Sequence, residues 1–168
     1  SDLSKRDTLY LKGSKSALKA FENSDFYKSF SDTSSLENNK KKLEAIKKAP
    51  IETIGVLFWW ATNHGKYLIN KPIIERIESR EILELAMYRI STLDEDYYYG
   101  GPSRFFGMFY SRLPGVPLER ARINFDESLL DNPNYFGTRV LRARYYHTKL
   151  GNREQFQNDL KHVIETDP

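Results

Sequence analysis

Apolar residues recur at intervals of three and four along most of the chain, and this spacing constrains the fold more than any other feature. Ile82, Ala86, Ile90 and Leu93 follow it, with polar residues between them. Residues three and four apart share one face of an α-helix, so the spacing predicts amphipathic helices. Strand signals are scarce, because no Asn-Gly or Asp-Gly turn separates alternating apolar runs. The sequence therefore predicts an all-α protein.

We expect these helices to be joined by short turns, which favours antiparallel helical hairpins. The expected ranges are 7–22, 34–48, 52–69, 72–93, 102–113, 117–130, 134–149 and 152–165. Residues 23–33 have the least regular pattern, and we expect an exposed loop there that carries Phe26, Tyr27 and Phe30. The length of 168 residues is that of one domain or of a short array of repeats. We expect a single helical-repeat domain over residues 1–168.

Three of the expected helices end on similar sequences, which indicates an internal repeat. Asp94 and Asp131 stand at equivalent points 37 residues apart, and Pro133 and Pro168 are 35 residues apart. Both spacings are close to the period of about 34 residues that tetratricopeptide repeats have. Gly107 would let the two helices of the middle repeat approach closely. We expect tetratricopeptide-like hairpins that stack into an α-α superhelix.

The sequence carries no signature of an enzyme. It contains no Cys, and its histidines, at positions 64, 147 and 162, lack the spacing of a helical zinc site. Neither a Gly-x-Ser-x-Gly motif nor a phosphate-binding loop is present. We expect no catalytic residue, no metal and no cofactor. The alternative from another class is a hydrolase or lyase that uses His147 or His162 as its base.

The excess of positive charge lies in the first 50 residues. The overall net charge is +3, and Lys40, Lys41, Lys42, Lys47 and Lys48 form the main basic cluster. The lysines surround apolar residues at helical spacing, which is typical of a solvated helix face. No aromatic residue stands among them to stack on bases. We therefore expect no nucleic-acid partner.

Aromatic residues are concentrated between Tyr97 and Tyr110, where seven occur in 14 positions. A Gly-Gly-Pro turn at 100–102 gives the backbone freedom there and then a preset helix start. So many Tyr together favour an amphipathic cavity or contact surface, because a buried Tyr needs a partner for its hydroxyl. The ordinary core of a helical hairpin is the alternative interpretation for each aromatic side chain.

Two adjacent aromatic pairs, Trp59-Trp60 and Tyr145-Tyr146, add to this surface. Neighbouring helix residues point about 100° apart, so at least one member of a pair can face away from the core. The residues that we expect to bind a ligand or a partner are Trp59, Trp60, Tyr97, Tyr98, Tyr99, Arg104, Phe105, Phe106, Tyr110 and Tyr146.

Several stretches of the chain resemble the TRAP-transporter T-component (TatT) family. They are Leu57–Ala61, Leu93–Gly107 with its Tyr-Gly-Gly-Pro turn, the turn Leu113-Pro114-Gly115, the helix Leu118–Leu130 and the segment Asn134–Tyr146. The resemblance extends from about residue 9 to the end of the sequence. Its most specific element is the Tyr-Gly-Gly-Pro turn followed by an aromatic helix.

The resemblance implies an exported, non-enzymatic accessory protein of a tripartite ATP-independent periplasmic (TRAP) transporter. The implied partner is the solute-binding P-component, and we expect a small organic, partly apolar ligand in the aromatic-lined cavity. Such proteins are expected to be periplasmic lipoproteins tethered through an N-terminal Cys. This sequence has no Cys, and we expect that it lacks the native leader and lipid anchor. A homo-oligomer is a further expectation.

The alternative function is that of a generic tetratricopeptide adaptor that binds a protein or a peptide. The grooves of such adaptors usually present Lys, Arg and Asn as a clamp for a carboxylate. Arg139 with Arg142, or Arg120 with Asn124, would supply such a clamp.

Overall fold

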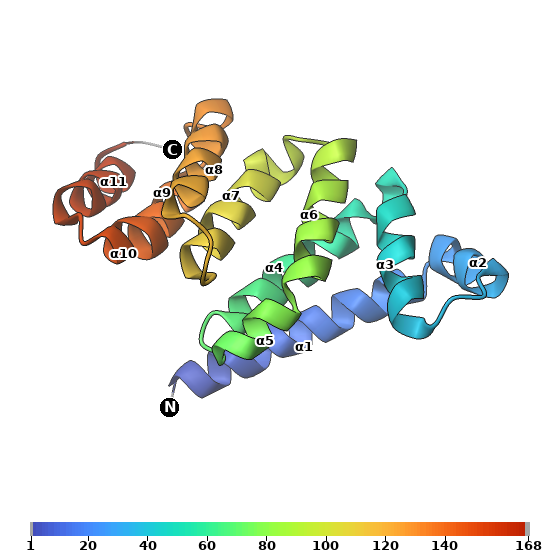
Figure 1. The fold of residues 1–168 in the computed structure, drawn as a ribbon. Coiled ribbons are helices and arrows are strands. Elements are labelled where there is room, and N and C mark those ends of the chain that lie inside the picture. Colours follow the sequence, from blue (N-terminus) through green and yellow to red (C-terminus); the bar gives the residue numbers. More distant parts are fainter. Residues whose placement is uncertain (1, 167–168) are drawn as a thin grey trace. The chain divides into compact units, whose positions relative to one another are not determined.

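The protein consists of helices joined by short turns over the range that the computed structural model describes, residues 2–166 (Figure 1). No strand occurs within that range, which confirms the all-α prediction. Contacts along the chain define two compact units, Ser1–Glu95 and Asp96–Pro168. The single helical-repeat domain and the superhelix both stay predictions.

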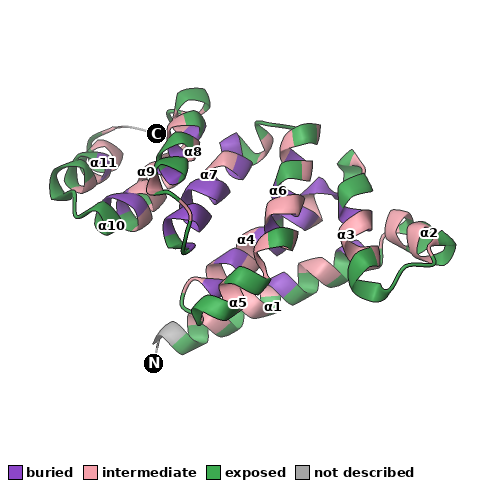
Figure 2. Ribbon diagram, in the orientation of Figure 1, coloured by how far each residue is buried: buried purple, intermediate pink, exposed green. Residues whose placement is uncertain are grey.

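The first unit is a set of packed helices. In chain order they are α1 (Asp2–Glu22), α2 (Asp25–Thr33), α3 (Asn38–Lys48), the 3₁₀ turn η1 (Ile51–Thr53), α4 (Ile54–Leu68), α5 (Ile73–Glu78) and α6 (Arg80–Leu93). Helix α4 packs along α1 and also contacts α6. Fully buried Leu57 and Ala61 of α4, together with Leu83 and Met87 of α6, form the centre of this core. Figure 2 shows buried positions along both helices.

The expectation of an exposed loop over 23–33 is wrong, because most of this segment is helix α2. Ser24 caps the helix, because its side-chain oxygen accepts a hydrogen bond from the backbone N–H of Tyr27 at 3.2 Å. The rings of Phe26 and Tyr27 both pack on Phe21, with centroids 6.3 and 5.3 Å from its ring. A cap and a local aromatic cluster are sufficient to order nine residues that lack a long apolar repeat.

Two other expected helices are interrupted. The range 72–93 is divided at Ser79, whose ψ of −5° departs from the helical value of about −42°. The range 134–149 contains α9 (Phe136–Leu141), the π-helical segment η2 (Arg142–His147) and α10 (Thr148–Leu150). Neither interruption has a Pro or Gly within it, so no residue type marks the break in the sequence.

The second unit starts with a helical hairpin formed by α7 (Tyr97–Arg112) and α8 (Leu118–Asp131). The close approach expected at Gly107 is confirmed, because a Cβ atom there would lie 2.7 Å from Cγ of Phe125. Phe125 and Ala121 of α8 are fully buried against α7. The unit is completed by α9, η2, α10 and α11 (Arg153–Glu165), and α11 packs on η2 and α9.

Among the described residues, no helix combines the length and the apolar character that crossing a bilayer requires.

We predict that Gly107→Ala lowers the free energy of unfolding by about 1–3 kcal/mol, because the added methyl group overpacks the α7–α8 contact. Denaturant titration monitored by circular dichroism measures the change. Gly13→Ala in α1 is the matched control: its Cβ would lie 3.3 Å from the side chain of Asn63, which can shift aside. Equal stability of the two variants would contradict the prediction.

Candidate functional site

The tyrosine segment at the start of α7 has an unusual backbone. Tyr98, Tyr99 and Gly100 have φ angles of 53°, 58° and 65°, in the left-handed region. Left-handed backbone costs a residue with a Cβ atom about 1–2 kcal/mol. The left-handed turn therefore begins at Tyr98, two residues before the Gly-Gly-Pro turn that the sequence predicts. Contacts elsewhere must stabilise this conformation.

Arg104 supplies those contacts from the next turn of α7. Its Nη1 donates to the carbonyl oxygen of Tyr99 at 2.7 Å, and its Nη2 donates to that of Tyr98 at 2.9 Å. The side chain is buried, with 6% of its surface exposed. Burial lowers the pKa of Arg104, and the neighbouring Tyr135 and Tyr98 oppose this effect. No ion pair found between described residues involves Arg104, and its guanidinium contacts the two backbone carbonyls and the rings of Tyr98 and Tyr135.

Three tyrosines form a cluster around this arginine. The guanidinium carbon of Arg104 lies 4.3 Å from the ring centroid of Tyr135, and Tyr135 stacks on Tyr99 at 5.1 Å with an interplanar angle of 13°. Tyr98 contacts both rings edge-on, at 5.9 and 6.0 Å. Tyr98 is 39% exposed and Tyr99 is 56% exposed. We call Tyr98, Tyr99 and Tyr135 the tyrosine cluster.

A hollow of about 540 Å³ adjoins the tyrosine cluster. It is lined by Tyr99, Asp131, Asn132, Pro133, Asn134 and Tyr135. Gly137 makes room for the ring of Tyr135, because a Cβ atom at position 137 would lie 2.6 Å from that ring. The amide of Asn132 donates to the carboxylate of Asp96, whose carbonyl oxygen accepts from the N–H of Gly100. These bonds join the end of α8 to the left-handed turn.

The structure brings together three of the expected site residues, Tyr98, Tyr99 and Arg104. Half-buried Tyr97 directly precedes them. Four other expected residues are buried in the second unit: Phe105, Phe106, Tyr110 and Tyr146. The rings of Phe106 and Tyr110 stack at 5.4 Å along α7. A binding role for these four buried residues stays a prediction.

The two tryptophans belong to the first unit. Trp59 is 41% exposed on α4, whereas Trp60 is buried and stacks on His64 with centroids 6.4 Å apart. The expectation that one member of the pair faces away from the core is confirmed. Their role in binding stays a prediction.

Sequence reasoning missed Tyr135, Asp131 and Asn134 as site residues. All three belong to the helix-end segment that recurs in the sequence, and Tyr135 also lies in a stretch that carried the family resemblance. The available signal was the recurrence of this segment after α6 and α8. By itself, this recurrence indicates only the boundaries of repeats.

The family model described as TRAP transporter T-component matches residues 2–168. The chain belongs to the TRAP transporter T-component family. Membership supports an accessory role in a TRAP transporter. A search of curated proteins finds no significant match.

The arginines considered for a peptide clamp have partners within this T-component. Arg142 binds the carboxylate of Asp159 through two hydrogen bonds of 2.8 and 2.6 Å, and Arg139 lies 3.4 Å from the same group. Arg120 lies over the ring of Tyr110 at 4.4 Å and donates to its hydroxyl at 3.1 Å. A partner's carboxylate would have to compete with these contacts.

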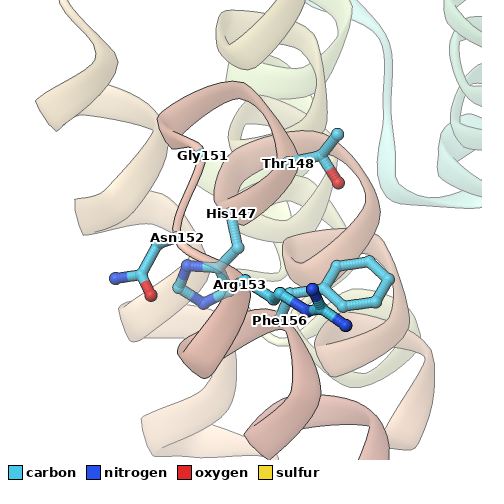
Figure 3. Close-up of a pocket in the computed structure, with 6 residues that line it drawn as sticks. All are labelled: His147, Thr148, Gly151, Asn152, Arg153 and Phe156. Atoms are coloured by element: carbon cyan, nitrogen blue, oxygen red, sulfur yellow. The ribbon is translucent and has the colours of Figure 1, made fainter.

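A second, smaller hollow lies at the turn between α10 and α11 (Figure 3). It measures about 260 Å³ and is lined by His147, Thr148, Gly151, Asn152, Arg153 and Phe156. The π-helical turn places Arg142 and His147, five residues apart, on the same side of the segment, where both reach Asp159. Nε2 of His147 lies 3.3 Å from Oδ2 of Asp159, without the geometry of a hydrogen bond.

Burial lowers the pKa of His147, and the nearby Asp159 opposes this effect only in part. The folded T-component therefore favours the neutral imidazole. No group of His, Asp and Glu side chains in the described part of the chain is arranged to hold a metal ion.

We predict that Arg104→Lys lowers the free energy of unfolding by about 2 kcal/mol. The single ammonium group of Lys cannot replace the two guanidinium nitrogens that donate to the carbonyl oxygens of Tyr98 and Tyr99. Denaturant titration measures the loss, and near-ultraviolet circular dichroism reports the release of the tyrosines. Arg153→Lys, at an exposed position on α11, is the matched control. Unchanged tyrosine signals in Arg104→Lys would contradict the proposed role of the Arg104 guanidinium.

We also predict that stability falls as the pH drops from 7 towards 5. The lowered pKa of His147 means that the unfolded chain binds more protons in this window, so protonation below the ordinary value of about 6.5 favours unfolding. His64, whose pKa burial also lowers, acts in the same direction. His147→Gln should reduce the slope of unfolding free energy against pH. An unchanged slope would show that His147 does not contribute.

Proposed function

We propose that this T-component is a non-enzymatic accessory scaffold that binds the solute-binding P-component through the tyrosine cluster. Family membership supports the accessory role in the transporter. The observation that carries the finer proposal is the exposure of Tyr98 and Tyr99 on a left-handed turn that buried Arg104 holds in place. On this proposal the protein works in the periplasm, tethered in its native form as a lipoprotein.

Exposed, rigid tyrosines are effective contact residues. A Tyr side chain presents a large amphipathic area and has only two side-chain torsions to restrain, so it loses little entropy when a partner covers it. The stacking of Tyr99 on Tyr135 restrains these torsions before any partner arrives. Residues of this kind are enriched among those that dominate interface energies.

The hollow beside the cluster gives the surface a concave part. Its volume of about 540 Å³ falls in the range of about 300–1,000 Å³ that is typical of small-molecule sites. Tyr99, Tyr135 and Pro133 supply apolar surface, and Asn132 and Asn134 supply polar groups. A small organic, partly apolar ligand is therefore a second candidate occupant of the same surface.

The generic adaptor is the less favoured function. Arg139, Arg142 and Arg120 already bind groups of this chain, which weakens the case for a clamp on a peptide carboxylate. Asn124 donates to the carbonyl oxygen of Arg120. The adaptor function would be favoured if the protein bound extended peptides with a terminal carboxylate more tightly than it bound the P-component.

We predict that replacing Tyr98 and Tyr99 together by Ala weakens binding to the P-component by about 2–4 kcal/mol, the cost typical of truncating central interface tyrosines. Isothermal titration with the P-component of the same transporter measures the affinity. Tyr88→Ala on α6, a similarly exposed tyrosine of the first unit, is the matched control. Equal affinities for the wild type and the double variant would overturn the proposed interface.

A further inference from the structure

A carboxylate and the C-terminal end of a helix place negative charge at the hollow beside the tyrosine cluster. Asp131, the last residue of α8, lines it and is exposed. The C-terminal end of a helix carries a partial negative charge, so a carboxylate at that end is unfavourable unless a cation lies nearby. Helix α8 has no basic residue in its last turn. The carboxylate and the helix end therefore add their potentials at this point.

The chain supplies no cation to this carboxylate among the residues that the structure describes. None of the ion pairs found between them includes Asp131. Arg122, on the same helix, binds Glu119 and Asp126 instead. Arg104 is buried, and its guanidinium donates to the carbonyls of the left-handed turn.

A second carboxylate close to the hollow also lacks a cationic partner in the described range. Asp96 accepts a hydrogen bond from the neutral amide of Asn132, which lines the hollow. No ion pair found there involves Asp96. The two carboxylates and the end of α8 make the hollow favourable for a positive charge.

The tyrosines that line the hollow, Tyr99 and Tyr135, favour a cation that stacks on aromatic rings. Tyr99 is 56% exposed although its ring stacks on Tyr135, so much of its surface is open to an incoming group. A cation within about 6 Å of a Tyr ring centroid is attracted by the ring's negative face. A guanidinium group is planar and weakly hydrated, stacks on aromatic rings, and binds a carboxylate through two parallel hydrogen bonds.

We propose that this hollow receives an arginine side chain of the P-component, stacked on Tyr99 and paired with Asp131. The inference rests on the proposed function and adds the chemistry of the contact. The chain already contains one stacked arginine of this kind, because the guanidinium of Arg104 lies 4.3 Å from the ring centroid of Tyr135. A carboxylate-bearing ligand is disfavoured in this position by the charge of Asp131.

The first experiment tests the chemistry without the partner. N-acetylarginine amide is titrated into the T-component, and N-acetylcitrulline amide, which has nearly the same shape without the charge, is the control. The resonances of Tyr99 and of the Asp131 carboxyl group are followed by NMR. We expect saturable shifts with the arginine probe only. Equal responses to the two probes, or none to either, would overturn the inference.

The second experiment uses the P-component. We expect Asp131→Asn to weaken its binding about tenfold or more at low salt, with a smaller loss at high salt. Glu127→Gln, an exposed carboxylate of the same helix that lies outside the hollow, should change the affinity less than twofold. Thermal unfolding shows that the variants are folded, and Asp131→Asn removes an unfavourable charge at the helix end, so no loss of stability is expected.

The outcomes separate the inference from the proposed function. Loss of binding in Asp131→Asn, with Glu127→Gln unchanged, supports the arginine contact. Wild-type affinity in Asp131→Asn overturns the contact and leaves the proposed function standing. Failure of the wild-type T-component to bind the P-component overturns the proposed function, and the arginine contact with it.

Discussion

The candidate surface depends on one buried arginine. Arg104 donates to the carbonyl oxygens of Tyr98 and Tyr99 and lies against the ring of Tyr135. A buried guanidinium is costly unless its donors are used, and two left-handed tyrosines are costly unless their turn is fixed. Each of these unfavourable features is stabilised by the other. The result is a set of exposed rings whose positions are fixed by the interior of the second unit.

The close packing behind this surface also depends on a few residues. Gly107 lets the ring of Phe125 lie directly on α7, and Gly100 brings the turn against Ser128 of α8. Further along, η2 uses a π-helical turn to direct Arg142 and His147 to the single carboxylate of Asp159. In the left-handed turn and in η2, irregular backbone thus accompanies a close approach or a polar contact.

Sequence patterns predicted the helices well where the apolar repeat was long. The range 117–130 and the observed Leu118–Asp131 differ by one residue at each end. The prediction was wrong for α2, because its order comes from a serine cap and from aromatic contacts with Phe21, which no apolar period reveals. The dense aromatic segment 97–110 contains the exposed Tyr98 and Tyr99, but its phenylalanines and Tyr110 are buried. This segment did not indicate Tyr135, which joins the cluster from 36 residues beyond Tyr99.

The sequence by itself determined the helical class, the close approach at Gly107 and, through residues 2–168, the T-component family. These follow from local periodicity, from the absence of a side chain, and from residue types in a fixed order. Only the tertiary structure decided which aromatic residues are exposed and which fill the core. Phe105 and Tyr99 are equally aromatic in the sequence, yet one is 3% exposed and the other 56%. The difference arises because a left-handed turn, held by an arginine five residues further on, directs one ring outward while the helix that follows buries the other.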